Sequence, residues 1–259
     1  MKGSEMAAGP QSPRGGSPLP TRRNEKVAEQ VAREILRVIQ RDGLAPGSTL
    51  PSEALMLERF NIGRGSLREA LRILEVNGLV IIKTGPGGGP IVAASTPASF
   101  GQMWTLHLQS IGSTYRELLD TRIEYESMLA RRAAERVNAA TAREISATLQ
   151  ETVDLPADDI QYATVTTGFH SVVCDAGGNS VMALATNAIQ SIWSRRVTTV
   201  LFAPEDRPLV HQHHRDIAGA IERGSGRKAE QLMRAHMEHY REYCERRYPA
   251  RLDDVVDWS

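Results

Sequence analysis

Residues 47–85 read GSTLPSEALMLERFNIGRGSLREALRILEVNGLVIIKTG, and the fold of the N-terminal third follows from this stretch. Ser52 precedes a short apolar run and is a good helix N-cap, so it predicts a helix of about two turns. A second helix is expected from Arg64 to Gly78, because apolar residues recur in it at the spacing of one helical face. That buried stripe consists of Leu67, Ala70, Leu71 and Leu74.

The segments on either side complete the pattern. Residues 24–42 place Val27, Val31 and Ile35 at helical spacing, which predicts a helix before this stretch. Residues 79–94 read as two short apolar strands around a glycine-rich turn. Three helices followed by a β-hairpin is the order of a winged helix-turn-helix.

The helix that begins at Arg64 carries arginines on the face away from its leucines. Arg64, Arg68 and Arg72 lie one turn apart, and a guanidinium offers the paired donors that match a guanine edge or a phosphate. Gly65 and Ser66 leave room for close approach, and the free amides there favour phosphate oxygens. On an isolated helix three arginines are more often a solvated face. Between a short helix and a hairpin they indicate a helix that reads DNA.

The rest of the chain divides by composition. Residues 1–22 are rich in Gly, Pro and Ser and predict a disordered tail, after which the winged helix-turn-helix occupies 23–94. Residues 94–98 read as a short linker. From 95 to 248 the pattern is almost entirely helical, so we expect an all-α bundle there and a C-terminal tail at 249–259.

Charge is unevenly spread along a chain whose 31 basic and 31 acidic side chains balance. Residues 1–94 hold 13 Lys and Arg against 9 Asp and Glu, a net charge of +4, which leaves −4 for residues 95–259. A mildly basic first third fits a nucleic-acid module.

Cys174 and Cys244 indicate neither a disulfide framework nor a cysteine-based zinc site. With no signal peptide and no apolar run of membrane-spanning length, the sequence predicts a soluble cytoplasmic protein.

Residues 47–85 closely resemble the DNA-binding domain of the GntR superfamily of bacterial transcription regulators. The shared motifs are LPSE at 50–53, R-x-S-L-R-E-A-L at 64–71 and GLV at 78–80 before a glycine-containing wing. The resemblance implies a homodimer that binds a palindromic operator in double-stranded DNA. It implies that the contacts come from Arg64, Gly65, Ser66 and Arg68 on the recognition helix and from Lys83 and Gly85 on the wing.

The helical segment resembles the FCD-type ligand-binding domain of the FadR subfamily, an all-α bundle of six to seven helices. The matching stretches are RIEYESMLARRAAER at 122–136, FHSVVCDAGGN at 169–179 and HRDIAGAIERGSGRKAEQLMRAHM at 214–237. Many of these domains bind a divalent metal through one Asp and three His. The resemblance implies that the ligands here are His170, His214 and His236, and that Thr166 stands in place of the Asp.

Thr166 leaves three arrangements open, because a protonated hydroxyl is a poor metal ligand. A weaker three-histidine site, completed by water or by an effector carboxylate, suits zinc or nickel. A metal-free pocket would use the histidines to hydrogen-bond an effector directly. A nearby group could also replace the Asp, and His211, one turn before His214, has the geometry for it. His213 points away from His214 on the helix and is expected at the surface.

Arg122 matches an arginine that in relatives pairs with an effector carboxylate, although an ordinary salt bridge on a charged helix would also explain it. The resemblance thus implies a metabolite-responsive regulator whose effector is a small organic acid. Two alternatives remain: a DNA-binding protein with a decayed pocket, for which Thr166 is the sign, and a metal-dependent enzyme. The sequence shows no positioned general base and no HExxH pair, and an enzyme would leave the DNA-binding domain without a role, so we expect a regulator.

Overall fold

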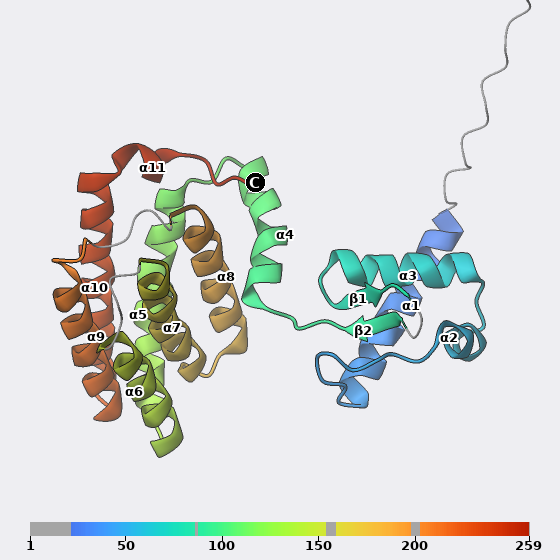
Figure 1. Cartoon of the computed structure of the whole chain (residues 1–259), viewed down its shortest axis with the longest axis horizontal. Helices are drawn as coiled ribbons and strands as arrows, with labels where there is room; N and C mark the ends of the chain where they lie inside the picture. The colour runs from blue at the N-terminus through green and yellow to red at the C-terminus, as the bar shows by residue number, and fades with distance from the viewer. Residues whose placement is uncertain (1–21, 86–87, 154–158, 198–202, 259) are drawn as a thin grey trace, which may run out of the picture. The chain divides into compact units, whose positions relative to one another are not determined.

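The computed structural model describes residues 22–85, 88–153, 159–197 and 203–258. The tail expected at residues 1–22 therefore lies outside the described residues, apart from Arg22. Contacts within the chain divide it into two units, Met1–Ala94 and Ser95–Ser259, and each is described by itself. Three helices and a two-stranded hairpin build the first unit, and helices build the second, which confirms the predicted fold class (Figure 1).

The first unit packs α3 (Arg64–Val76) against α1 (Arg22–Arg41) and α2 (Glu53–Phe60). Ser52 caps α2 as predicted, because its side chain accepts a hydrogen bond from the Leu55 amide. Asn61 ends α2 in the left-handed conformation, with φ of 50°, and so allows the tight turn into α3. The apolar stripe of α3 is buried, together with Ala28, Val31, Ile35, Leu50 and Met56.

A hairpin closes the first unit. Strands β1 (Val80–Lys83) and β2 (Gly89–Val92) pair antiparallel, with Val80 opposite Val92 and Lys83 opposite Gly89. Both valines are buried in the core shared with α3, so the hairpin is fixed on the helices at its base. Residues 86–87, between the two strands in the sequence, lie outside the described residues.

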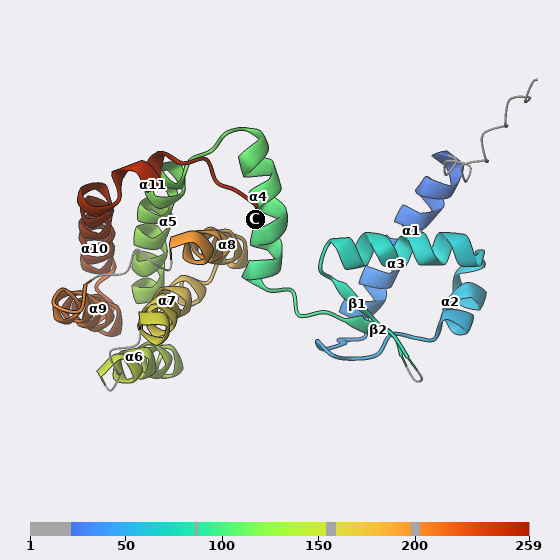
Figure 2. The same cartoon turned by 45° about the horizontal axis from the view of Figure 1, so that its top comes forward.

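The second unit contains seven longer helices and one short helix among its described residues. In chain order these are α4 (Pro97–Ser110), α5 (Tyr115–Arg136), α6 (Ala139–Val153), α7 (Asp159–Ala176), α8 (Ser180–Val197), α9 (Arg207–Glu222), α10 (Gly226–Arg247) and α11 (Pro249–Asp253). Helix α5 runs through the middle and contacts α7, α8, α9 and α10 (Figure 2). Its buried face includes two charged side chains, Arg122 and Glu126. Buried charges need partners, so this pair marks a place to look for a site.

The linker between the units is shorter than the sequence indicated. Helix α4 begins at Pro97, inside the expected linker 94–98. Thr96 and Ser99 form a capping box at its start, and Pro at the first helical position fits that geometry.

The expected tail at 249–259 is part of the bundle instead. Leu252 of α11 and Val256 beyond it are buried in the main core of the second unit. The Tyr115 amide donates to the Asp254 carbonyl and fixes this segment beside the start of α5. The sequence concealed the packing because five residues of helix are too few to show a helical period.

The longest helices of the second unit, α5 and α10, have 22 residues each but carry many charges. Within the described ranges, no helix has both the length and the apolar character needed to cross a bilayer.

Candidate DNA-binding face and histidine site

Helix α3 has one buried face and one free polar face. Arg64, Arg68 and Arg72 are exposed, and none of them forms an ion pair with another described residue. Leu67 and Leu71 hold the opposite face in the core. Three uncommitted guanidinium groups on a rigid helix are available for base edges or phosphates.

The start of α3 is open as well. Gly63 is the N-cap and gives no side-chain hydrogen bond, so the first amides of the helix keep their donors for a ligand. Gly65 is exposed, and a methyl group added to its Cα would meet no atom of the chain within 4 Å. Ser66 beside it is half-buried. This end of α3 can therefore approach a phosphate closely.

The wing residues lie at the far end of the hairpin. Lys83 is exposed as the last residue of β1. Gly85 follows with φ of 100°, a backbone conformation that favours glycine and starts the turn. Both residues thus sit next to the hairpin tip, where the sequence analysis expects the wing.

In the second unit, three helices each bring one histidine to a common buried point. His170 comes from α7, His214 from α9 and His236 from α10, and each is at most 4% exposed. His236 Nε2 lies 3.2 Å from His214 Nε2 and 3.3 Å from His170 Nε2. The potential ligand atoms of all three residues lie within 4.8 Å of one another. The residues named from the sequence therefore form one cluster.

The surroundings of His214 and His236 favour the uncharged form of both imidazoles. Burial lowers the pKa of His214 and of His236 well below 6.5, and the neighbouring imidazoles lower both further. The Phe169 ring stacks on His214, with ring centres 4.1 Å apart, and fixes its plane. A neutral imidazole with a free lone pair is the form that binds a metal.

The spacing of the cluster fits a divalent transition metal. A tetrahedral site with Zn–N bonds of about 2.0–2.1 Å separates its nitrogens by about 3.3 Å, and His236 Nε2 lies 3.2 and 3.3 Å from the Nε2 atoms of the other two histidines. Buried nitrogen lone pairs that face one another repel unless a proton or a cation lies between them. Three imidazoles suit zinc or nickel and leave a further position for water or a carboxylate.

Thr166, at the position of the family Asp, lies one turn before His170 on α7. Its Oγ1 and the Oη of Tyr162, one turn earlier, are both buried, and the two hydroxyl groups interact with each other. Each hydroxyl can donate one hydrogen bond and accept two, so this buried pair keeps capacity for a polar ligand on one face of the helix.

Helix α9 faces this part of α7 with polar groups of its own. Arg207 lies over the Tyr162 ring, 4.4 Å from its centre. His211, one turn further along α9, is half-buried, and its Nδ1 is also buried without a hydrogen-bond partner among the described residues. We call Tyr162, Thr166, Arg207 and His211 the polar strip. His211 lies outside the group of ligand atoms that His170, His214 and His236 form.

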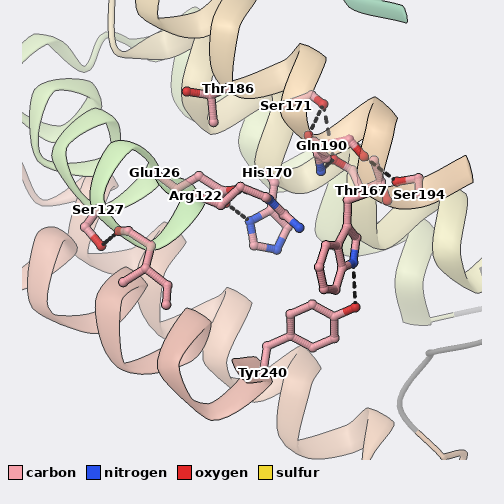
Figure 3. A network of polar contacts seen from close by, with 12 residues as sticks. Arg122, Glu126, Ser127, Thr167, His170, Ser171, Thr186, Gln190, Ser194 and Tyr240 are labelled. Atoms are coloured by element: carbon pink, nitrogen blue, oxygen red, sulfur yellow. Dashed lines mark hydrogen bonds and ion pairs between the residues drawn. The ribbon is translucent and has the colours of Figure 1, made fainter. Parts of the chain in front are cut away.

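A carboxylate from α5 reaches the cluster, and the sequence analysis missed it. Glu126 is fully buried, with Oε2 2.5 Å from His170 Nδ1 (Figure 3). Its Oε1 accepts a hydrogen bond of 2.7 Å from Arg122 Nε. Burial alone would raise the pKa of Glu126, but Arg122 and His170 outweigh it and hold the pKa at about 2. Arg122, expected to face an effector carboxylate, thus binds a carboxylate of its own helix.

The sequence does contain a signal for this pair. Arg122 and Glu126 are four residues apart, the spacing of a helix ion pair. They share a face with Leu119, Ile123 and Ala130, which are all buried. An ion pair on the apolar face of a helix indicates a buried polar site, whereas the same pair on a polar face is solvated.

His213 is half-buried, and not at the surface as expected. Its Nδ1 lies 3.5 Å from His236 Nδ1, and its ring centre is 5.5 Å from that of His239. Helical spacing correctly turns it away from His214. However, α10 packs along α9, so His213 contacts the outer side of a different histidine of the cluster.

Comparison with known proteins assigns both units. Residues 27–88 match the family of bacterial regulatory proteins named gntR, and residues 117–239 match the FCD domain. The chain belongs to the GntR superfamily of transcription regulators. The first match contains α3 and its arginines, and the second contains all three histidines of the cluster.

Relatives of similar length are regulators of transcription and not enzymes. The HTH-type transcriptional repressor NanR of Enterobacter sp. (strain 638) is 28% identical over 223 residues, which is 82% of this chain and 83% of that protein. NanR of Escherichia coli (strain K12) is 27% identical over 219 residues, 82% of each protein. A solved structure, Streptococcus agalactiae GntR, has a TM-score of 0.64 at 22% identity, covering 83% of this chain and 99% of that one, and shares the fold.

Proposed function

We propose that the protein is a homodimeric repressor that acts in the cytoplasm, binds a palindromic operator, and changes its DNA affinity when a small organic acid binds near a metal in the second unit. The observation that carries the proposal is the buried cluster of His170, His214 and His236 in a chain that also presents free arginines on α3. The relatives named as repressors support the sign of regulation.

For the DNA contacts, Arg64 and Arg68 are the residues that read bases or hold phosphates in the major groove. The amides around Gly65 and Ser66 bind the backbone at the start of α3. Lys83 and Gly85 carry the wing to the neighbouring minor groove. Two copies of this face related by a two-fold axis read a palindrome.

For the metal, His170, His214 and His236 hold zinc or nickel. Because Thr166 brings no charge, the three neutral imidazoles leave both positive charges of the ion uncompensated at the ligand positions. The ion supplies a positive charge and an open position, both of which attract a carboxylate. The role of the metal in this proposal is to bind the effector and order the helices around it, and not to catalyse a reaction.

For the effector, the hydrogen-bonding groups of the polar strip beside the cluster suit a ligand with several oxygen atoms. Tyr162 Oη and Thr166 Oγ1 are buried hydroxyl groups that interact with each other, and His211 Nδ1 is buried without a partner among the described residues. A ligand that bridged from the metal to this strip would satisfy His211 Nδ1, which removes a cost of about 1–3 kcal/mol, and would meet the two hydroxyl groups as well. Arg207 at its far end suits an anionic or carbonyl oxygen.

For the dimer, exposed apolar side chains offer surface that a second copy would cover. Tyr125 and Met128 share one face of α5, and Val181 and Leu184 share one face of α8. Single exposed apolar residues are ordinary, so these two pairs support a dimer only where a second copy covers both side chains of a pair.

The test combines DNA selection with effector screening. Selection from random duplexes should enrich a palindrome, and light scattering should give a dimer. Operator affinity of zinc-loaded protein is then measured by fluorescence anisotropy with hydroxy acids and dicarboxylates, and at least one acid should change the affinity about tenfold. Enrichment without two-fold symmetry would contradict the dimer. Acids that leave operator affinity unchanged would favour a decayed pocket, for which Thr166 is the observation.

A further inference from the structure

We propose that Glu126 is the positioning residue of the metal site: it fixes the tautomer and ring orientation of His170 and supplies the negative charge that Thr166 cannot. The inference rests on the proposed metal site and adds to it a residue on a fourth helix, α5. It also gives Arg122 a role as the partner of Glu126.

The contacts of His170 lead to this role. One ring nitrogen, Nδ1, lies 2.5 Å from Glu126 Oε2, and the other, Nε2, lies 3.3 Å from His236 Nε2 inside the cluster. An ionised carboxylate only accepts hydrogen bonds, so Nδ1 must carry the proton that it donates to Glu126. In a neutral imidazole the lone pair is then on Nε2, pointing at the place where the ligand nitrogens converge.

Glu126 is itself held in one orientation. Its second oxygen, Oε1, accepts from Arg122 Nε at 2.7 Å, and both side chains are almost fully buried, with relative exposures of 6% for Arg122 and 0% for Glu126. Figure 3 shows the two side chains leaving α5 together and reaching His170 on α7. A carboxylate fixed at both oxygens cannot turn away, so the imidazole it binds cannot rotate freely.

The charge balance of the site supports the same role. Among the described residues, the group of potential ligand atoms contains three histidines and no carboxylate. The carboxylate of Glu126 contacts this group through His170: it lies at Nδ1, on the other side of the imidazole ring from the ligand nitrogen Nε2. A carboxylate on the outer nitrogen makes an imidazole more basic and strengthens its bond to a metal, and loss of such a partner typically costs about 10- to 100-fold in affinity.

A purely structural ion pair is the competing explanation, and a matched pair of variants separates the two. Glu126→Gln removes the charge and keeps the shape. Glu124→Gln removes a carboxylate from the same helix, where it pairs with Arg234 at 2.7 Å and is 62% exposed. Both variants remove an ion pair of α5, but only the carboxylate of Glu126 contacts His170.

Zinc affinity is measured by competition with a chromophoric chelator on the full-length wild-type protein and both variants, with circular dichroism as the folding check. Glu126→Gln should bind zinc about 10- to 100-fold more weakly, and its cobalt-loaded form should show altered d–d absorption. Glu124→Gln should match the wild type in both. Zinc affinity and cobalt spectra that stay unchanged in Glu126→Gln would overturn the inference.

A second measurement needs no variant and decides the proposal even if Glu126→Gln fails to fold. Long-range nitrogen–proton NMR of ¹⁵N-histidine-labelled wild-type protein, free of metal, reports which ring nitrogen carries the proton. His170 should be protonated at Nδ1, and a proton mainly on Nε2 would overturn the inference. A wild type that binds no zinc would overturn the proposed metal site and this role with it, whereas zinc binding indifferent to Glu126→Gln overturns this role alone.

Discussion

At the scale of single residues, the two functional surfaces need opposite environments. The arginines of α3 must be exposed and unpaired to meet DNA, and the structure leaves Arg64 and Arg68 so. A metal binds the neutral form of histidine, and burial favours that form here by lowering the pKa of His214 and of His236. Arginine and histidine are common residues. What distinguishes these side chains is their position on the helix, which leaves the arginines exposed and the histidines buried.

Arg64→Ala and Arg68→Ala should each weaken binding to the selected operator about 5- to 150-fold, since a good bidentate contact is worth about 1–3 kcal/mol. The melting temperature should not change, because both side chains are exposed. Arg33→Ala, exposed on α1, is the control and should bind like the wild type. Wild-type operator affinity in both α3 variants would show that another surface reads the DNA.

The metal-free protein should lose stability as pH falls below about 6.5. The pKa of His214 and of His236 is lowered in the folded state, so the unfolded chain takes up protons in a range where the folded chain does not. Their contribution is complete above the unfolded pKa of about 6.5 and declines below it, by up to about 1.4 kcal/mol per pH unit for each histidine. Urea unfolding between pH 7.5 and 5 measures this, and a flat stability profile would contradict it.

At the scale of elements, the site depends on four helices that each contribute one face. The spacing of Thr166 and His170 puts both on the same face of α7. α9 and α10 bring His214 and His236, and α5 lies behind His170 with Glu126. A shift of α7, α9 or α10 would separate ligand atoms that now lie within 4.8 Å, so the cluster depends on how these three helices pack.

Thr166→Asp should tighten zinc binding at least about tenfold, because it adds an oxygen ligand and a negative charge one turn from His170. In the metal-free protein the same change should lower the melting temperature, since a buried carboxylate would then face no cation. Thr164→Asp, on the exposed side of α7, should do neither. Zinc affinity that is unchanged by Thr166→Asp would place the metal elsewhere.

The segment after α10 should be needed for stability. Leu252 is 1% exposed, so Leu252→Ala should cost about 2–5 kcal/mol of unfolding free energy. Val255→Ala is the neighbouring control, 45% exposed, and should change stability by less than about 0.5 kcal/mol. Chemical denaturation measures both, and equal effects would mean that α11 does not pack on the bundle.

The positions of the helices could be predicted from the sequence. The contacts of Glu126 and His213 with the histidine cluster were not predicted. Caps and apolar periodicity located α2 and α3, with Ser52 at one start. The resemblance to FCD-type domains pointed to the three histidines. The spacing of Arg122 and Glu126 alone does not distinguish a solvated ion pair from a buried one, and only the apolar residues on the same face, Leu119, Ile123 and Ala130, indicate that this pair is buried. His213 was placed at the surface because a single helix says nothing about the neighbour that packs against it.

At the scale of the whole molecule, one chain joins a basic DNA-binding unit to an acidic unit with a buried ligand cluster, at net charges of +4 and −4. Under the proposed function the two sites are thermodynamically linked. If an acid bound in the second unit weakens operator binding by some factor, the operator weakens binding of that acid by the same factor. In this scheme acid binding depends on the metal, because the positive charge of the ion attracts the carboxylate.

Metal content is therefore the most direct measurement. The protein is purified without chelators and without a histidine tag, and its metal is counted by mass spectrometry alongside His214→Ala and His236→Ala variants. We expect about one zinc or nickel ion per chain in the wild type, little in either variant, and a higher melting temperature when zinc is added back to stripped wild-type protein. Wild-type protein that carries no metal and gains no stability from added zinc or nickel would contradict the account.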